Sequence, residues 1–185
     1  MKYSKKEIID ISKAWAAISL AFAILLRGST GSFLTSLILS ALTVGVGFLL
    51  HELGHKYLAQ KYGCFAEFKS FDQMLVLAVA LSFFGFIFAA PGAVFISGYV
   101  NRERNGKISA IGPAINIVLA VLFILLTSFS TGFLSLIGTY GSSINAWLAL
   151  FNMIPVWNFD GRKVWMWSKP VWFVIAIVAF VILFF

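Results

Sequence analysis

The chain contains 185 residues, of which 61% are hydrophobic and 11% charged, and its mean hydropathy is +0.95. These values exclude an ordinary soluble domain and indicate an integral membrane protein. The formal net charge is +7. In a chain this apolar we expect the basic side chains to face anionic lipid, and we expect no nucleic-acid-binding role. The composition predicts an all-α polytopic membrane protein, a single integral membrane domain over residues 1–185, with the lipid bilayer as a partner.

Basic residues are grouped at three places near the ends of apolar segments. They are Lys2, Lys5, Lys6 and Lys13; Arg102, Arg104 and Lys107; and Arg162, Lys163 and Lys169. Groups of this kind mark the cytoplasmic side of a membrane segment. We therefore expect a multi-pass protein of the cell membrane with a cytoplasmic N-terminus.

The first two apolar segments differ in length. Residues 11–26 are short for a membrane span, and we predict a peripheral N-terminal helix there, followed by a turn of small residues at 28–32. Residues 33–62 number about 30, which corresponds to roughly 45 Å of helix and exceeds the roughly 30 Å of the hydrocarbon core. The end of this second helix must therefore leave the membrane.

The third apolar segment, residues 74–90, is interrupted by Gly85. If this segment crossed the membrane fully, the basic group at 102–107 would lie on the extracellular side, against the charge rule. We therefore favour a re-entrant or partly inserted segment with its turn at Gly85, whose irregular backbone is buried against protein.

The remaining chain alternates between polar and apolar stretches. Residues 91–109 contain β-branched and aromatic residues bounded by glycines, then the sequence NRERNGK, and together these predict a small membrane-associated β-hairpin. Pro113 suits the first turn of a helix over residues 110–128. The predicted bundle is completed by a polar loop (130–143), a helix (144–156) and a peripheral C-terminal helix (170–185).

The sequence HELGH places the only two histidines of the chain four residues apart. On a helix this spacing puts the imidazoles of His51 and His55 on one face, where both can bind one metal ion, and Glu52 projects to the adjoining side. Single buried histidines are often structural, but ionisable groups in a membrane segment cost on the order of several kcal/mol unless they are paired or metal-bound. The motif therefore predicts a zinc site, one ion per chain, with a third protein ligand and an open position for water.

The third ligand is sought among seven acidic residues. Five of them lie in segments rich in charged or turn residues and are expected to be solvated: Glu7, Asp10, Glu67, Asp72 and Glu103. Glu52 belongs to the motif, which leaves Asp160, a carboxylate that follows a long apolar run. The helix leading to Asp160 is expected to begin near Gly141 and to bring it to a depth similar to that of His51.

Three motifs occur on successive apolar segments in a fixed order. They are HELGH, then GPAIN at 112–116, then N-x-x-P-x-x-x-x-D-G, formed by Asn152, Pro155, Asp160 and Gly161. Together they resemble the site-2 protease family of intramembrane zinc metalloproteases, in its compact prokaryotic form without a PDZ domain. The resemblance covers about residues 33–165, which would be the catalytic core.

The resemblance implies that His51, His55 and Asp160 bind zinc. It also implies that Glu52 is the catalytic base and that Asn116 lies close to the active site. The expected activity is that of a zinc metalloendopeptidase, which hydrolyses peptide bonds within the transmembrane segments of single-span membrane-protein substrates in regulated intramembrane proteolysis.

Several roles stay open at this level. Asn116 either stabilises the tetrahedral oxyanion or forms an interhelical hydrogen bond. The strand expected at residues 93–100 either pairs with substrate along its edge or only closes the bundle. Water must reach Glu52, and we expect the active site to open on the cytoplasmic side near Lys56. Two alternative functions are a divalent-metal transporter and a non-catalytic membrane scaffold of the same fold.

Overall fold

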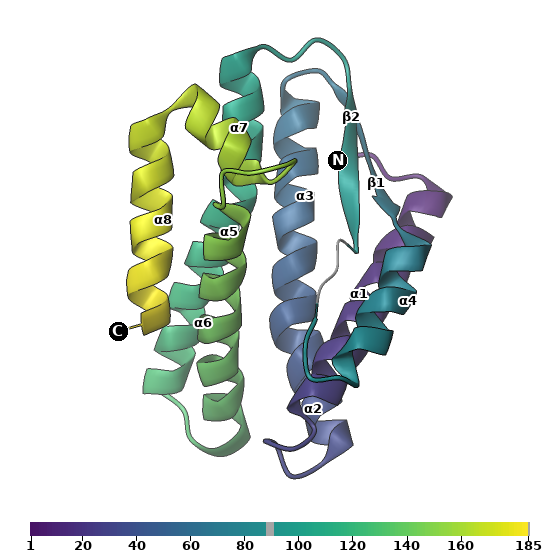
Figure 1. Cartoon of the computed structure of the whole chain (residues 1–185), viewed down its shortest axis with the longest axis vertical. Helices are drawn as coiled ribbons and strands as arrows, with labels where there is room; N and C mark the ends of the chain where they lie inside the picture. The colour runs from purple at the N-terminus through teal and green to yellow at the C-terminus, as the bar shows by residue number, and fades with distance from the viewer. Residues whose placement is uncertain (88–90, 185) are drawn as a thin grey trace.

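The structure is a computed structural model that describes residues 1–87 and 91–184. Its helices are α1 (Lys5–Leu26), α2 (Phe33–Ser40), η1 (Ala41–Gly45), α3 (Val46–Lys61), α4 (Asp72–Ser82), α5 (Arg102–Ser128), α6 (Gly132–Asn152), α7 (Asp160–Trp167) and α8 (Lys169–Phe184), and its strands are β1 (Phe65–Ser70) and β2 (Gly92–Ser97). Helix α3 lies at the centre, with the sheet, α1 and α4 on one side and α5, α6 and α8 on the other (Figure 1). The predicted fold class, a helical bundle with a small β-hairpin, is confirmed.

Three helical stretches in the described part of the chain are long and apolar enough to cross a membrane. They are Lys5–Leu26, Phe33–Lys61 and Arg102–Ser128. Large apolar side chains are exposed along them, for example Leu34 at 65% and Val118 at 58% of their full area. Such faces are stable in contact with lipid and not with water. The structure therefore agrees with the predicted membrane protein.

The second apolar segment is one continuous helix of 29 residues, Phe33–Lys61, as predicted. It is α-helical except for the π-helical turn η1, which separates α2 from α3. At about 1.5 Å per residue it is roughly 43 Å long. Phe48 on α3 meets Phe68 on β1 edge-to-face, with ring centroids 6.0 Å apart, and this contact joins the helix to the sheet.

Helix α1 begins earlier than the predicted start at Ile11, because Ser4 caps it. The Ser4 hydroxyl accepts a hydrogen bond from the backbone N–H of Glu7 at 3.0 Å. Glu7 and Asp10 are only 1% and 6% exposed, so the prediction that both are solvated is wrong. Each has a cation beside it, Lys56 for Glu7 and Lys13 for Asp10.

The two strands pair antiparallel, with Phe65 opposite Ser97 and Ser70 opposite Gly92. The hairpin predicted within residues 91–109 is therefore wrong in its pairing, because β2 finds its partner before α4. The NRERNGK sequence begins a helix instead of a turn. The Asn101 side chain caps this helix by accepting a hydrogen bond from the backbone N–H of Arg104 at 2.8 Å.

Helices α5 and α6 are both longer than predicted. Pro113 lies inside α5 and not in its first turn. Helix α6 begins at Gly132, so the polar loop predicted at 130–143 and the helix start near Gly141 are wrong. The hydroxyls of this stretch bond to the helix's own carbonyls, as Thr139 does to Ser135 at 3.0 Å, which lets a small-polar sequence remain helical.

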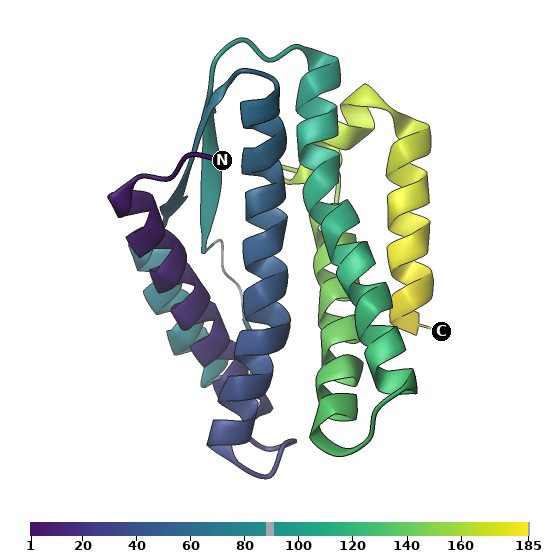
Figure 2. The ribbon, with the colours of Figure 1, turned by 180° about the vertical axis from the view of Figure 1, so that it is seen from behind.

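The third apolar segment contains the short helix α4, followed by a turn at Gly85, where φ is +87°. Eleven residues correspond to about 16 Å of helix, too short to cross a hydrocarbon core of about 30 Å. The predicted end of this segment falls on residues 88–90, which lie outside the described residues. Helix α4 packs along α1 on one flank of the bundle (Figure 2).

Candidate metal centre

His51, His55 and Asp160 converge on one point in the interior. The two histidines lie one turn apart on α3, with ring centroids 4.7 Å apart. Asp160, the first residue of α7, places Oδ2 at 3.2 Å from Nε2 of His51 and 3.0 Å from Nε2 of His55. One potential ligand atom from each residue lies within 4.8 Å of the others. The structure thus brings together the three metal ligands expected from the sequence.

A hydrogen-bond acceptor lies behind each imidazole. Nδ1 of His51 lies 2.6 Å from Oδ1 of Asn116, and Nδ1 of His55 lies 2.7 Å from the carbonyl oxygen of Ile108. Because a carbonyl oxygen only accepts, each Nδ1 carries the proton and each Nε2 presents its lone pair to Asp160. An acceptor that fixes the tautomer in this way is typical of metal-binding histidines.

The donor set fits zinc. Two Nε2 lone pairs and a carboxylate oxygen point toward one another, an arrangement that a cation between them stabilises. Two imidazoles and one carboxylate are the ligands of many catalytic zinc sites, in which a fourth position stays open for water.

Gly112, the glycine of the GPAIN motif, lets α5 approach the metal-binding face of α3. A Cβ atom at this position would lie 2.6 Å from Nε2 of both His51 and His55. That distance is shorter than any normal contact, so a side chain here would displace one of the rings. The glycine is therefore explained by the close approach of α5 to the two histidines.

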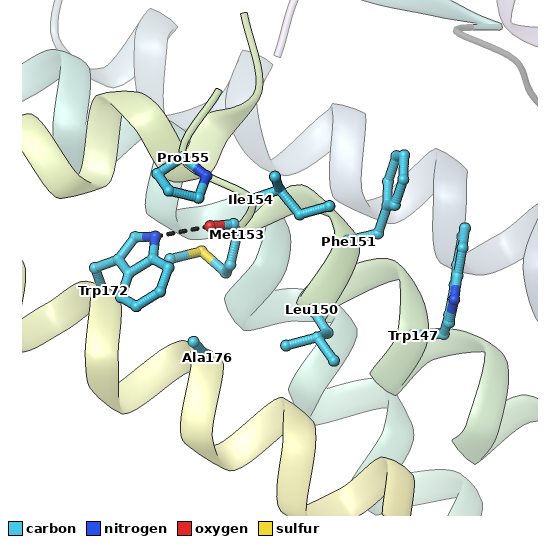
Figure 3. A pocket seen from close by; sticks show the side chains of 8 residues that line it. All are labelled: Trp147, Leu150, Phe151, Met153, Ile154, Pro155, Trp172 and Ala176. Carbon is cyan, nitrogen blue, oxygen red and sulfur yellow. Dashed lines mark hydrogen bonds between the residues drawn. The ribbon is translucent and has the colours of Figure 1, made fainter. Parts of the chain in front are cut away.

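The loop 153–159 carries the chain from α6 to Asp160 and is anchored at its start. The indole Nε1–H of Trp172 on α8 donates to the carbonyl oxygen of Met153 at 2.7 Å (Figure 3). Gly161, just after the ligand, packs so closely on the backbone of Met153 that it leaves no room for a Cβ atom. Helix α8 and the glycine thus hold the start of α7, and with it Asp160, in place.

Glu52 lies at a cavity of about 1080 Å³ that is also lined by His51, His55 and Asp160. The cavity is bordered by α3, by the loop before α7 and by residues 92–96 of strand β2. Lys56 is fully buried and paired with Glu7, so the residues that the structure describes leave no opening beside Lys56 and that prediction is wrong. Glu52 and strand β2 line the same cavity.

Asn116 is fully buried, and its side chain is engaged on both sides. Its oxygen faces His51, and its Nδ2 donates to the carbonyl oxygen of Gly47 at 3.2 Å and to Oδ1 of Asn145 at 2.9 Å. Both amide hydrogens are therefore used within the protein. This geometry favours the interhelical hydrogen bond over the oxyanion role for Asn116.

Sequence reasoning missed two groups of residues around the site. Asn145, fully buried on α6, contacts Asn116, and its only signal is a polar residue within the apolar run at 144–151. The Glu7–Lys56 pair was missed because charged residues near a chain end usually face solvent. The Ser4-x-x-Glu7 capping pattern was visible, but it predicts only where α1 begins.

Comparison with known proteins identifies two relatives in Methanocaldococcus jannaschii. The chain is 41% identical over 181 residues to a protein named "Putative zinc metalloprotease MJ0611", a match that covers 95% of this chain and 92% of that protein. It is 26% identical over 122 residues to "Zinc metalloprotease MJ0392", covering 64% of this chain and 31% of that protein.

No protein-family model matches the chain. No solved structure matches it with significance. The first relative is nevertheless similar over nearly its whole length, and the match extends over nearly all of this chain. The chain therefore belongs to the zinc metalloprotease family that this archaeal relative represents.

Proposed function

We propose that this chain is an intramembrane zinc metalloprotease of the site-2 type, which hydrolyses peptide bonds in the transmembrane segments of single-span membrane proteins. The observation that carries the proposal is the convergence of His51, His55 and Asp160 beside Glu52 within a bundle of membrane-length helices. Both relatives carry the words zinc metalloprotease in their names, which supports the metal and the reaction class.

The proposed chemistry assigns one role to each residue. A zinc ion held by His51, His55 and Asp160 would lower the pKa of a bound water toward about 7 and polarise the scissile carbonyl. Glu52 accepts the proton of that water and passes it to the leaving amine. The site needs no other base, because Glu52 faces the same cavity as the three ligands.

The substrate segment must lose its helical hydrogen bonds before it is cleaved. A transmembrane helix keeps its carbonyls in internal hydrogen bonds, and an unwound segment needs new partners for its backbone. Strand β2 borders the cavity, and β1 occupies one of its edges. We propose that an extended substrate segment pairs with the other edge of β2, next to Glu52.

The depth and orientation of the site follow from α3 and the basic residues. His51 lies ten residues before Lys61, about 15 Å along the helix, which supports a site below the membrane surface. The N-terminus reaches this end of α3, since the backbone N–H of Lys2 donates to Gln60 at 3.3 Å. Arg104 lies over the Tyr62 ring at 5.3 Å, so a second basic group is at the same end. We propose that this end is cytoplasmic.

The proposal is tested with Glu52→Gln in liposomes that contain the purified protein and a single-span substrate. We expect cleavage to be lost while zinc remains bound, because the amide cannot accept the proton of water but leaves the three ligands in place. Glu103→Gln, a change at an exposed carboxylate on α5, is the control and retains cleavage. Cleavage by the Glu52 variant at the wild-type rate contradicts the proposal.

A further inference from the structure

Two asparagines, Asn116 on α5 and Asn145 on α6, form a fully buried pair among apolar helices. Nδ2 of Asn116 donates to Oδ1 of Asn145 at 2.9 Å. Nδ2 of Asn145 in turn donates to the carbonyl oxygen of Gly141, one turn earlier on α6, at 2.9 Å. At the other end, Oδ1 of Asn116 lies 2.6 Å from Nδ1 of His51. A continuous chain of hydrogen bonds therefore runs from the backbone of α6 to a metal-facing histidine.

The direction of this chain is set by two backbone carbonyls. Those of Gly47 and Gly141 can only accept, so each must face an amide nitrogen and not an amide oxygen. If both asparagine side chains were flipped, an oxygen would face each carbonyl and Nδ2 of Asn116 would face His51. Two buried oxygen–oxygen contacts would replace two hydrogen bonds. The unflipped arrangement is therefore strongly favoured.

The packing around the pair restricts the side chain of Asn145 on the side that faces α3. Its amide lies against Gly47 of α3, so closely that a Cβ atom at Gly47 would overlap with it. Asn145 thus contacts α3 by packing and α5 by its hydrogen bond to Asn116. It does not touch the metal ligands themselves, and its influence on them passes through Asn116.

We infer that Asn145 is a positioning residue for the metal centre, which holds the amide of Asn116 so that its oxygen accepts from Nδ1 of His51 and leaves Nε2 free to bind metal. The inference rests on the proposed zinc site at His51, His55 and Asp160. It extends that site to a third helix, α6, which supplies none of the ligands.

The inference predicts that loss of Asn145 affects His51 and not His55. His55 is oriented by the carbonyl oxygen of Ile108, which belongs to the backbone and does not depend on Asn145. Without Asn145, the amide nitrogen of Asn116 keeps only its bond to Gly47, and the amide can rotate away from His51. Some molecules would then hold the proton of His51 on Nε2, where it blocks the metal. Loss of Asn145 should therefore weaken zinc binding without removing any ligand.

Zinc affinity, measured by chelator competition on the purified protein without substrate, tests the inference. In Asn145→Leu, which keeps the number and branching of the side-chain heavy atoms but removes both hydrogen bonds, we expect affinity to fall on the order of tenfold, the low end for residues that orient a metal ligand. Asn145→Asp still offers an oxygen to Asn116 and should bind zinc more tightly than Asn145→Leu. Should the leucine variant fail to fold, Asn145→Ala makes the same comparison.

The matched control is Thr43→Val on the helix that carries His51. Thr43 is fully buried, and its hydroxyl donates to the carbonyl oxygen of Leu39 at 2.7 Å, so the control removes a buried hydrogen bond of the same kind. Its zinc affinity should equal that of the wild type. A folded Asn145→Leu protein with wild-type zinc affinity overturns the inference, whereas a wild type that binds no zinc overturns the proposed site itself.

The visible spectrum of the cobalt-substituted protein gives a second readout. Cobalt reports its ligands and geometry through absorption bands that simple loss of stability does not shift. We expect the bands to change in Asn145→Leu and to remain in Thr43→Val. Identical spectra for wild type and Asn145→Leu, at full cobalt loading, also overturn the inference.

Discussion

The ammonium of Lys56 and the carboxylate of Glu7 form an ion pair in the interior, one residue beyond the metal-facing His55. Both side chains are about 1% exposed. The same carboxylate accepts a hydrogen bond from the backbone N–H of Phe68 at 2.9 Å, and the ring of Tyr3 lies 4.3 Å from the ammonium. Helix α1, helix α3 and strand β1 therefore meet at one buried charge pair beside the metal centre.

Removal of one partner of this pair should destabilise the protein strongly. In Lys56→Met the carboxylate of Glu7 is left buried without a cation, which typically costs about 3–5 kcal/mol of unfolding free energy. Glu7→Gln combined with Lys56→Met removes both charges and should recover most of the loss. The unfolding free energies of the single and the double variant are measured in detergent by circular dichroism. A double variant as unstable as Lys56→Met would show that the charge is not the cause.

Gly112→Ala should abolish tight zinc binding. The added methyl group would meet Nε2 of both His51 and His55 at 2.6 Å, so at least one imidazole must move off the metal position. We expect zinc affinity to fall by about a hundredfold, the upper end of the range seen when ligand orientation is lost. Chelator competition measures the change. Gly28→Ala, where a Cβ atom meets nothing within 4 Å, is the control and should bind zinc normally.

Asp160→Ala should reduce the zinc content of the purified protein from about one ion per chain to near zero, because two histidines alone leave the ion without its third protein ligand. Elemental analysis after dialysis measures it. Removal of zinc from the wild type by a chelator should also lower the unfolding temperature, since the ion binds the folded state only. Asp72→Ala, at an exposed carboxylate on α4, should retain the zinc; if it does not, the loss in Asp160→Ala is not specific.

Trp172→Phe should loosen the loop that leads to Asp160. The change removes the hydrogen bond from the indole to the carbonyl oxygen of Met153, worth about 1 kcal/mol. It also removes part of the ring's packing, and Trp147→Phe removes the same ring atoms. We expect faster amide hydrogen exchange at residues 153–160 and weaker zinc binding. Trp147→Phe is the control, since Trp147 lines the same pocket as Trp172 and stacks on Phe151 (Figure 3). Equal exchange in the two variants would argue against an anchoring role for Trp172.

The parts of the fold that the sequence predicted well depend on local patterns. The helix over 33–62 follows from an uninterrupted apolar run, and the shared face of His51 and His55 follows from helical geometry alone. Asp160 was identified because a membrane protein contains few carboxylates, so elimination is effective. The structure brings these residues together as expected, although their catalytic roles remain predictions.

The parts that were wrong depend on contacts between distant segments. Strand β2 was paired with the residues that follow it, but its partner β1 precedes it by a whole helix, and strand pairing over such a distance leaves no local signal. Residues 101–107 were assigned to a turn because of their polarity, whereas Asn101 caps a helix there. Glu7 was assigned to solvent because its partner, Lys56, is 49 residues away.

The π turn at Ala41–Gly45 precedes α3 on the same continuous helix, so it affects the direction in which the side chains of His51 and His55 point. A π turn accommodates one extra residue, and one residue corresponds to a rotation of about 100° in a regular helix. Because the wide turn absorbs the extra residue, deletion of one residue from it would restore an ordinary helix and leave both imidazoles facing Asp160. Deletion of one residue between Val46 and Leu50 has no such turn to absorb it and would rotate the imidazoles by about 100° relative to the preceding helix. The metal centre should therefore tolerate a deletion in the π turn and be lost on a deletion in the regular helix that follows it.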